Sequence, residues 1–138
     1  MPERIVVDTN VIVSATLKKH STPRKVINHI YYHSILLISP ETVKEIEEVL
    51  IRPKLDKYVH FDDRIYFFRR LIEKAVEIEI TSRITDCPDP KDNKFLELAI
   101  DGNATYIISG DRDLLDMNPY RNIKIISAAE YLNKSERF

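Results

Sequence analysis

Three aspartates, far apart in the sequence, stand where a strand is predicted to end or a helix to begin. Asp8 directly follows the apolar run at residues 5–7. Asp111 comes soon after a second apolar run, at residues 105–108, and Asp92 opens a predicted helix. In open α/β sheets the loops that follow the strands meet at one edge, so acids in these loops converge in space. The spacing therefore predicts a cluster of carboxylates.

Such a cluster predicts metal-dependent chemistry. Hard oxygen ligands select Mg²⁺ or Mn²⁺. These ions polarise phosphoryl oxygens and lower the pKa of bound water, so phosphodiester hydrolysis is the reaction that the cluster favours. The sequence contains neither G-x-G-x-x-G nor a Walker A motif, and dinucleotide or ATP binding is therefore not predicted.

Each of these acids also has a purely structural interpretation. Asp is a preferred N-cap residue, so Asp8 and Asp111 can accept hydrogen bonds from the helices that follow them. Asp89 and Asp92 have the three-residue spacing of a capping box. One acid of this kind is more often structural than catalytic, but three acids at one edge of a sheet favour a metal site.

A glutamate-rich helix, predicted at residues 40–51, offers a fourth acid. Its glutamates are Glu41, Glu45, Glu47 and Glu48, and its apolar stripe is formed by Val43, Ile46, Val49 and Leu50. At about 100° per residue, neither Glu45 nor Glu47 lies clearly closer to the edge of that stripe. Helical periodicity leaves the choice between them open.

The elements that must position these acids alternate along the chain. Short, mostly β-branched strands are predicted at residues 5–7, 35–38, 76–80, 105–108 and 123–126. Helices are predicted at residues 11–18, 23–33, 40–51, 62–74, 92–101, 111–116 and 128–134. Continuous apolar strands are buried on both faces, as in parallel sheets. The alternation predicts a doubly wound α/β sandwich.

Local signals support several helix ends. Ser39-Pro40 and Asp89-Pro90 each combine an N-cap residue with a proline at the first helical position. Gly102-Asn103 predicts the end of the helix that precedes residue 105.

Length and composition set the broad class. A chain of 138 residues predicts one domain, residues 1–138, and a single cysteine, Cys87, excludes an internal disulfide and suits a reducing compartment. The start of the chain lacks a signal-peptide pattern and no apolar run could span a bilayer, so we expect a cytoplasmic protein without membrane contact. The net charge is −1, so any affinity for nucleic acid must come from a local basic patch.

An aromatic-rich helical stretch separates the second and third predicted strands. Its aromatic side chains are Tyr58, Phe61, Tyr66, Phe67 and Phe68. Aromatic side chains dominate cores and interfaces, so this stretch predicts core or dimer-interface packing rather than a base-stacking surface.

Four motifs, in this order, make the chain resemble the PIN-domain ribonucleases over essentially its whole length. The motifs are Val6-Val7-Asp8-Thr9-Asn10, Ser39 followed by Glu45, Asp89-Pro90-Lys91-Asp92, and Ser109-Gly110-Asp111-Arg112-Asp113-Leu114-Leu115. The acidic helix and the Arg52-Pro53-Lys54 that follows it are most similar to the VapC-like branch, which is described as toxin components of toxin–antitoxin systems.

This resemblance implies a three-layer α/β/α sandwich with a five-stranded parallel sheet and a Mg²⁺- or Mn²⁺-dependent endoribonuclease. On matching positions the catalytic and metal-binding acids are Asp8, Glu45, Asp92 and Asp111, which settles the choice of glutamate. Asp113 is implied as an auxiliary metal-site acid, and Asn10 and Ser109 as residues that orient carboxylates by hydrogen bonds. The family often has Thr where this chain has Ser109, which keeps the hydroxyl. The implied partners are an RNA substrate, a small antitoxin and a second copy of the chain in a homodimer.

Basic residues next to the acids are the predicted RNA contacts. Arg112 adjoins Asp111 in the sequence, while Lys18, Lys19 and Arg24 follow the first helix after Asp8. We expect RNA to cross the acidic pocket along these side chains.

Other functions fit the sequence less well or stay open. A phosphoacceptor receiver domain needs paired acids after the first strand and a Lys after the fifth, where this chain has Thr9 and Ser127. A haloacid-dehalogenase-type phosphatase needs a second Asp at the position of Asn10. An RNA-processing or decay nuclease without an antitoxin, and an inactive PIN-fold binding module, remain as alternatives. The acids favour activity over the binding module, because all four are present.

Overall fold

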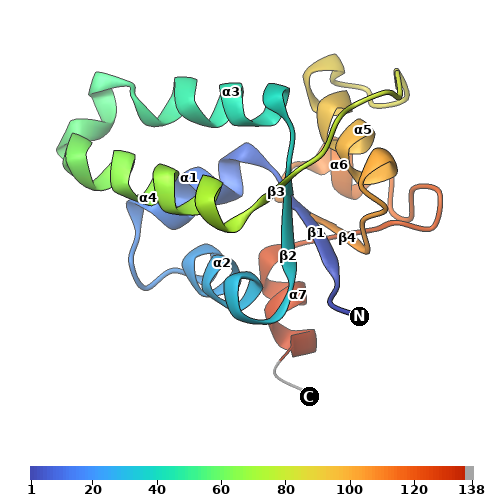
Figure 1. Ribbon diagram of the computed structural model, residues 1–138, viewed down its shortest axis with the longest axis horizontal. Coiled ribbons are helices and arrows are strands. Elements are labelled where there is room, and N and C mark those ends of the chain that lie inside the picture. Colours follow the sequence, from blue (N-terminus) through green and yellow to red (C-terminus); the bar gives the residue numbers. More distant parts are fainter. Residues whose placement is uncertain (136–138) are drawn as a thin grey trace.

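The computed structural model describes residues 1–135, in which five strands form one parallel sheet with helices on both faces (Figure 1). The strands are β1 (Arg4–Val7), β2 (Ile35–Ile38), β3 (Val76–Glu77), β4 (Tyr106–Ile108) and β5 (Lys124–Ile126). Their order is β3-β2-β1-β4-β5. The chain therefore builds outward from β1 to one edge and then returns to add β4 and β5 on the other side. The three-layer α/β/α fold predicted from the sequence is confirmed.

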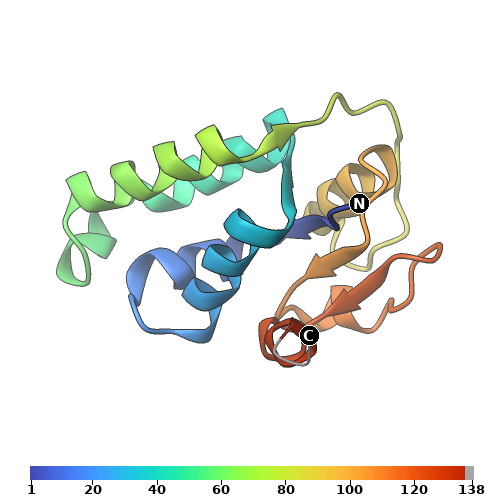
Figure 2. The ribbon, with the colours of Figure 1, turned by 60° about the horizontal axis from the view of Figure 1, so that its bottom comes forward.

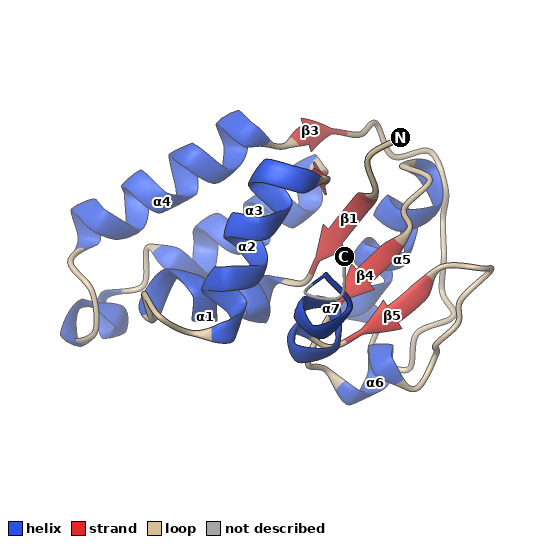
Figure 3. Cartoon of the chain, turned by 90° about the horizontal axis from the view of Figure 1, so that it is seen from below, coloured by secondary structure: helices blue, strands red, loops and turns tan. Residues whose placement is uncertain are grey.

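Helices cover the sheet on both sides (Figure 3). The α-helices are α1 (Thr9–Leu17), α2 (Thr22–His33), α3 (Pro40–Leu50), α4 (Phe61–Lys74), α5 (Asn93–Asp101), α6 (Arg112–Leu115) and α7 (Ala128–Ser135), and the short 3₁₀ helices are η1 (Pro53–Lys57) and η2 (Pro90–Asp92). One face is covered by α1, α2 and α7, and the other by α5 and α6. Within the described residues, no helix is long and apolar enough to span a membrane.

The alternation of side chains along each strand builds two cores. Ile5 and Val7 of β1 belong to one buried cluster, while Val6 between them belongs to the other. Ile107 and Ile108 of β4 divide in the same way. Successive residues of a strand point to opposite faces, so a run of apolar residues fills both layers.

The predicted helix ends agree with the structure. Ser39 caps α3 through a capping box with Thr42. Gly102 follows the end of α5, but the positive φ of 52° belongs to Asn103. A Cβ on Gly102 would lie 2.6 Å from Leu37 Cδ1 and 2.8 Å from the Leu98 carbonyl oxygen. The backbone oxygen cannot move aside as a side-chain end can, so this close approach favours glycine here, rather than its backbone conformation.

The third strand is present where it was predicted, but it is shorter and more exposed than expected. A strand buried on both faces was expected over residues 76–80, but β3 covers only Val76–Glu77, and both residues are exposed. This segment alternates apolar and acidic residues and lies at the edge of the sheet, where one side of the strand has no neighbour. Charged side chains on an exposed edge protect it from pairing with other chains.

Helices α3 and α4 form a hairpin that projects beyond the sheet (Figure 2). Phe67 packs into the core, as predicted, but Tyr58, Phe61 and Tyr66 are exposed. Arg64, fully buried, donates from Nε to the Leu50 carbonyl at 2.7 Å and pairs with Asp56. These contacts fix the tip of the hairpin and with it the far end of α3.

Candidate functional site

Two of the predicted acids lie side by side at the point where the strand order reverses. Asp8 follows β1 and Asp111 follows β4, and these strands are neighbours with Val7 opposite Ile108. The Asp8 backbone N–H donates to the Ile108 carbonyl at 3.0 Å. Ligand sites of open α/β sheets form at this position.

Ser109 connects these two acids. Its hydroxyl donates to Asp8 Oδ2 and accepts a hydrogen bond of 2.9 Å from the Asp111 backbone N–H. Asp8 Oδ1 also accepts from the Val11 N–H at 2.9 Å, so the N-cap interpretation of Asp8 is correct as well. Asp111 Oδ1 caps α6 through the Asp113 N–H at 2.9 Å. Asp8 and Asp111 thus each cap a helix with one carboxylate oxygen. The second oxygen of Asp8 also has a donor, the Ser109 hydroxyl.

The two acids of the motif at residues 89–92, Asp89 and Asp92, have different surroundings. Asp89 Oδ1 accepts from the Lys91 N–H at 3.1 Å and caps η2. Asp92 does not complete a capping box: its Oδ2 is buried and has no hydrogen-bond partner within the described residues. Carboxylate oxygens of Asp89, Asp92 and Asp113 lie within 4.8 Å of one another. A buried acceptor without a donor is costly unless a cation or another donor reaches it.

Crowding changes the proton affinity of these acids. Burial, followed by the neighbouring Asp111 carboxyl and by the charges of Asp89 and Asp8, raises the pKa of Asp92 to about 7. Burial also raises the pKa of Asp8, against the lowering effect of its hydrogen bonds from Ser109 and Val11. A divalent cation would relieve this repulsion, and the donor set, which consists of carboxylate oxygens, fits Mg²⁺ or Mn²⁺.

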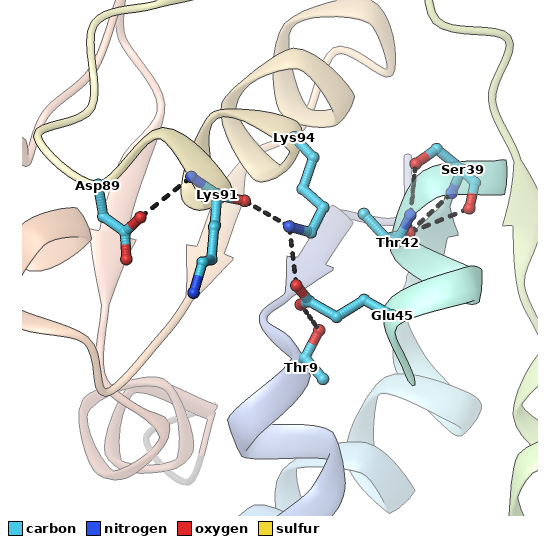
Figure 4. A network of polar contacts seen from close by, with 7 residues as sticks. All are labelled: Thr9, Ser39, Thr42, Glu45, Asp89, Lys91 and Lys94. Carbon is cyan, nitrogen blue, oxygen red and sulfur yellow. Dashed lines mark hydrogen bonds and ion pairs between the residues drawn. The ribbon is translucent and has the colours of Figure 1, made fainter. Parts of the chain in front are cut away.

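Glu45 points toward the same edge from α3 (Figure 4). Its Oε1 accepts from the Thr9 hydroxyl, and its Oε2 pairs with the Lys94 ammonium at 2.8 Å. Lys94 is only 8% exposed and also donates to the Lys91 carbonyl. This network joins the starts of α1, η2 and α5 to the middle of α3.

The neighbouring glutamates differ from one another. Glu47 is exposed and does not line the acidic cavity. Glu48 is also exposed, but it lines the cavity three residues beyond Glu45. Residues three apart on a helix share a face, so Glu45 and Glu48 point to the same side.

The acids line a cavity of about 460 Å³. Its walls are formed by Asp8, Thr9, Asn10, Glu45, Glu48, Val49, Arg52, Asp89, Lys91, Asp92, Phe95 and Asp111. Asn10 was expected to orient a carboxylate, but its exposed side chain makes no hydrogen bond within the described residues. Asp113 lies against Asp89 and Asp92 instead of on this wall.

The predicted RNA contacts lie outside this cavity. Arg112 is exposed at the start of α6, while Lys18 and Lys19 follow the far end of α1. Arg24 Nε donates to the Ala15 carbonyl at 2.7 Å, and its guanidinium stacks on Phe67. Lys19 and Arg24 line a second cavity of about 390 Å³ between α1, α2 and α4, together with Tyr31, Tyr66 and Arg70.

Several residues of the site were not predicted from the sequence. Lys94 and Glu45 lie 49 positions apart, so no helical spacing could reveal their contact. Thr9, Arg52 and Lys91 also line or support the cavity. All three stand inside the motifs that carry the family resemblance, but those motifs gave them no role of their own.

Comparison with known proteins identifies the family. Residues 4–113 match the family described as PIN domain, and the chain therefore belongs to it. A relative from Methanocaldococcus jannaschii, the uncharacterized protein MJ1680, is 32% identical over 98% of this chain and 93% of its own length.

Two solved structures share the fold. PAE2754 from Pyrobaculum aerophilum superimposes with a TM-score of 0.61 at 12% identity, over 100% of this chain and 98% of its own. A chain of VapBC2 from Rickettsia felis, in a crystal structure bound to a DNA fragment from the VapBC2 promoter, gives a TM-score of 0.59 at 12% identity. The match covers 88% of this chain and 96% of the Rickettsia chain.

Proposed function

We propose that this protein is a metal-dependent endoribonuclease that hydrolyses RNA phosphodiester bonds. One observation supports this most directly: the buried Asp92 Oδ2 has no partner in the described structure and lies beside the carboxylates of Asp89 and Asp113. In this proposal Asp8, Glu45, Asp92 and Asp111 are the catalytic acids around Mg²⁺ or Mn²⁺, and Asp113 is auxiliary. The bound ion would supply Lewis-acid polarisation of the phosphate and a water of lowered pKa.

The protein's own residues have complementary tasks. Ser109 holds the Asp8 carboxylate in place and binds the Asp111 backbone, so these two acids keep a fixed separation. Arg52 and Lys91, the cations on the cavity wall, are suited to bind RNA phosphates on either side of the cleaved bond. Phe95 contributes an apolar wall that limits the access of bulk water.

We infer a toxin role with a small antitoxin partner and a cytoplasmic site of action. The support is the likeness to a chain of VapBC2 together with the family membership. A homodimer is proposed through the hairpin of α3 and α4, where Tyr58, Phe61 and Tyr66 are exposed. Exposed aromatic side chains are enriched at protein interfaces.

The test is incubation of the purified protein with labelled RNA in Mg²⁺, in Mn²⁺ and in chelator. We expect endonucleolytic fragments with either ion and none with chelator. Asp111→Asn keeps an oxygen to cap α6 but removes one charge, and we expect it to abolish cleavage while the protein remains folded by circular dichroism. Full activity of Asp111→Asn would contradict the site, whereas RNA binding without cleavage by the wild type would favour an inactive binding module.

A further inference from the structure

The acidic site divides into two halves that differ in how their charges are satisfied. In the aspartate half, carboxylate oxygens of Asp89, Asp92 and Asp113 approach within 4.8 Å, and Asp92 Oδ2 is without a partner in the described residues. In the glutamate half, both oxygens of Glu45 already have protein donors. The first half thus has a buried oxygen without a donor in the described residues, whereas each Glu45 oxygen already has one.

Lys94 is the residue that produces this difference. Its ammonium lies 2.8 Å from Glu45 Oε2, and its side chain is 8% exposed against 31% for Glu45. It does not line the acidic cavity but faces a separate groove with Glu41, Pro90 and Asn93. Lys94 thus neutralises the Glu45 charge from the side away from the acidic cavity. The Thr9 hydroxyl holds the other carboxylate oxygen, Glu45 Oε1.

Neutralisation of this kind affects how many ions the site can hold. Paired metal sites hold their two ions roughly 4 Å apart and need carboxylate charge for both. A fixed ammonium beside Glu45 repels a second divalent ion and takes up the charge that would bind it. Added salt screens a short, buried ion pair less than it screens an exposed pair, so the repulsion of a second ion persists at higher salt concentrations.

We propose that the site holds a single divalent cation on its aspartates and that Lys94 is a positioning residue that replaces a second ion at Glu45. This inference rests on the proposed metal site and adds its stoichiometry. The same ammonium fixes the orientation of Glu45 on the cavity wall, because the pair joins α3 to α5.

The experiment counts bound Mn²⁺ by electron paramagnetic resonance on the full chain, without RNA. We expect one ion per wild-type chain and two per chain of Lys94→Met, which keeps most of the length of the unbranched side chain and removes its charge. Lys91→Met is the matched control, because it removes the same charge from the cavity wall without touching the Glu45 carboxylate. This control should bind one ion.

A second variant covers the case in which Lys94→Met does not fold. In Glu45→Gln one Mn²⁺ per chain should still bind, because its ligands are aspartates, but more weakly than in the wild type, because the Lys94 charge is no longer balanced. Two ions in the wild type, or loss of the ion in Glu45→Gln, would overturn the role of Lys94 while leaving the nuclease proposal intact. A wild type that binds no Mn²⁺ would overturn both.

Discussion

Two buried cations, Arg64 and Lys94, hold two regions of the molecule in different ways. Arg64 is 0% exposed and donates to the backbone carbonyls of Leu50 and Val59 as well as to Asp56. Its contacts belong to the tip of the hairpin, where each carbonyl it reaches lies at a helix end or in a turn. Arg64 therefore replaces water as the donor for groups that the helices leave unsatisfied.

Lys94 instead lies among groups that carry charge. Its carboxylate partner, Glu45, lines a cavity together with five further acids. The hairpin tip is thus a satisfied polar network, whereas the sheet edge concentrates like charges and leaves Asp92 Oδ2 without a partner in the described residues. Regions of the first kind serve stability, and regions of the second kind accept a lower stability in return for a binding site.

The largest expected effect is on the rate of RNA cleavage when Glu45, the partner of Lys94, is changed. Glu45→Gln removes the carboxylate charge from the cavity wall and leaves the Lys94 ammonium, on the side away from the cavity, without its charged partner. Loss of several kcal/mol of transition-state stabilisation corresponds to a rate reduction of about a thousandfold, at about 1.4 kcal/mol per factor of ten. The measurement is single-turnover cleavage of labelled RNA. Glu47→Gln, on the exposed side of the same helix, should cleave at the wild-type rate, and equal rates for the two variants would remove Glu45 from the site.

A smaller effect, on stability alone, is expected at the hairpin tip. Arg64→Met leaves the carbonyls of Leu50 and Val59 without their donor, which costs about 2–4 kcal/mol of unfolding free energy for one buried and one partly buried unsatisfied group. Asp56→Asn is the control: the Asp56 side chain is 62% exposed, so its change should cost less than about 1 kcal/mol. Urea unfolding measures both. Similar midpoints for the two variants would mean that the ion pair, and not the carbonyls, stabilises the tip.

The acidic edge should also respond to pH in the absence of metal. Burial and the nearby Asp111 raise the pKa of Asp92 from 3.8 to about 7, so between these values the folded state keeps a proton that the unfolded chain releases. The contribution of Asp92 to stability is therefore present at low pH and is lost as pH rises from about 4 to about 7. In chelator, the difference in melting temperature between wild type and Asp92→Asn should favour the variant increasingly from pH 5 to pH 7.5. A difference that moves in the opposite direction would show that the fold stabilises the Asp92 carboxylate.

The sequence predicted what depends on local pattern. The apolar runs before Asp8 and Asp111 predicted both strands, and the rules for loops at a sheet edge predicted that these acids meet. Ser39 and Gly102 marked helix ends because caps are local signals. Residues 76–80 were predicted as a buried strand although their alternation of apolar and acidic residues is typical of a strand with one exposed face, as at the edge of a sheet.

What the sequence could not predict depends on contacts between distant segments. The pairing of Lys94 with Glu45 needs α5 and α3 to pack together, and no pattern within either segment predicts that they pack against each other. The distance of Lys18 and Lys19 from Asp8 is a different case, because it follows from a local pattern: these residues are near one another in sequence but lie at opposite ends of α1. At a rise of 1.5 Å per residue, a helix of this length separates its ends by roughly 13 Å.

The smallest expected effect concerns RNA contacts beyond the acidic cavity, at this far end of α1. Lys19 lines the second cavity with Arg24 and Arg70, so RNA long enough to reach it would gain phosphate contacts there. Lys19→Glu should weaken binding of single-stranded RNA and reduce the slope of log K against log salt by about 0.7, the value for one phosphate contact. Lys124→Glu, an equal charge change at an exposed position on β5, is the control and should keep the wild-type slope. Binding measured by fluorescence anisotropy at several salt concentrations decides between them. If both variants keep the wild-type slope, RNA does not reach the second cavity, and its phosphates are bound near Arg52 and Lys91 alone.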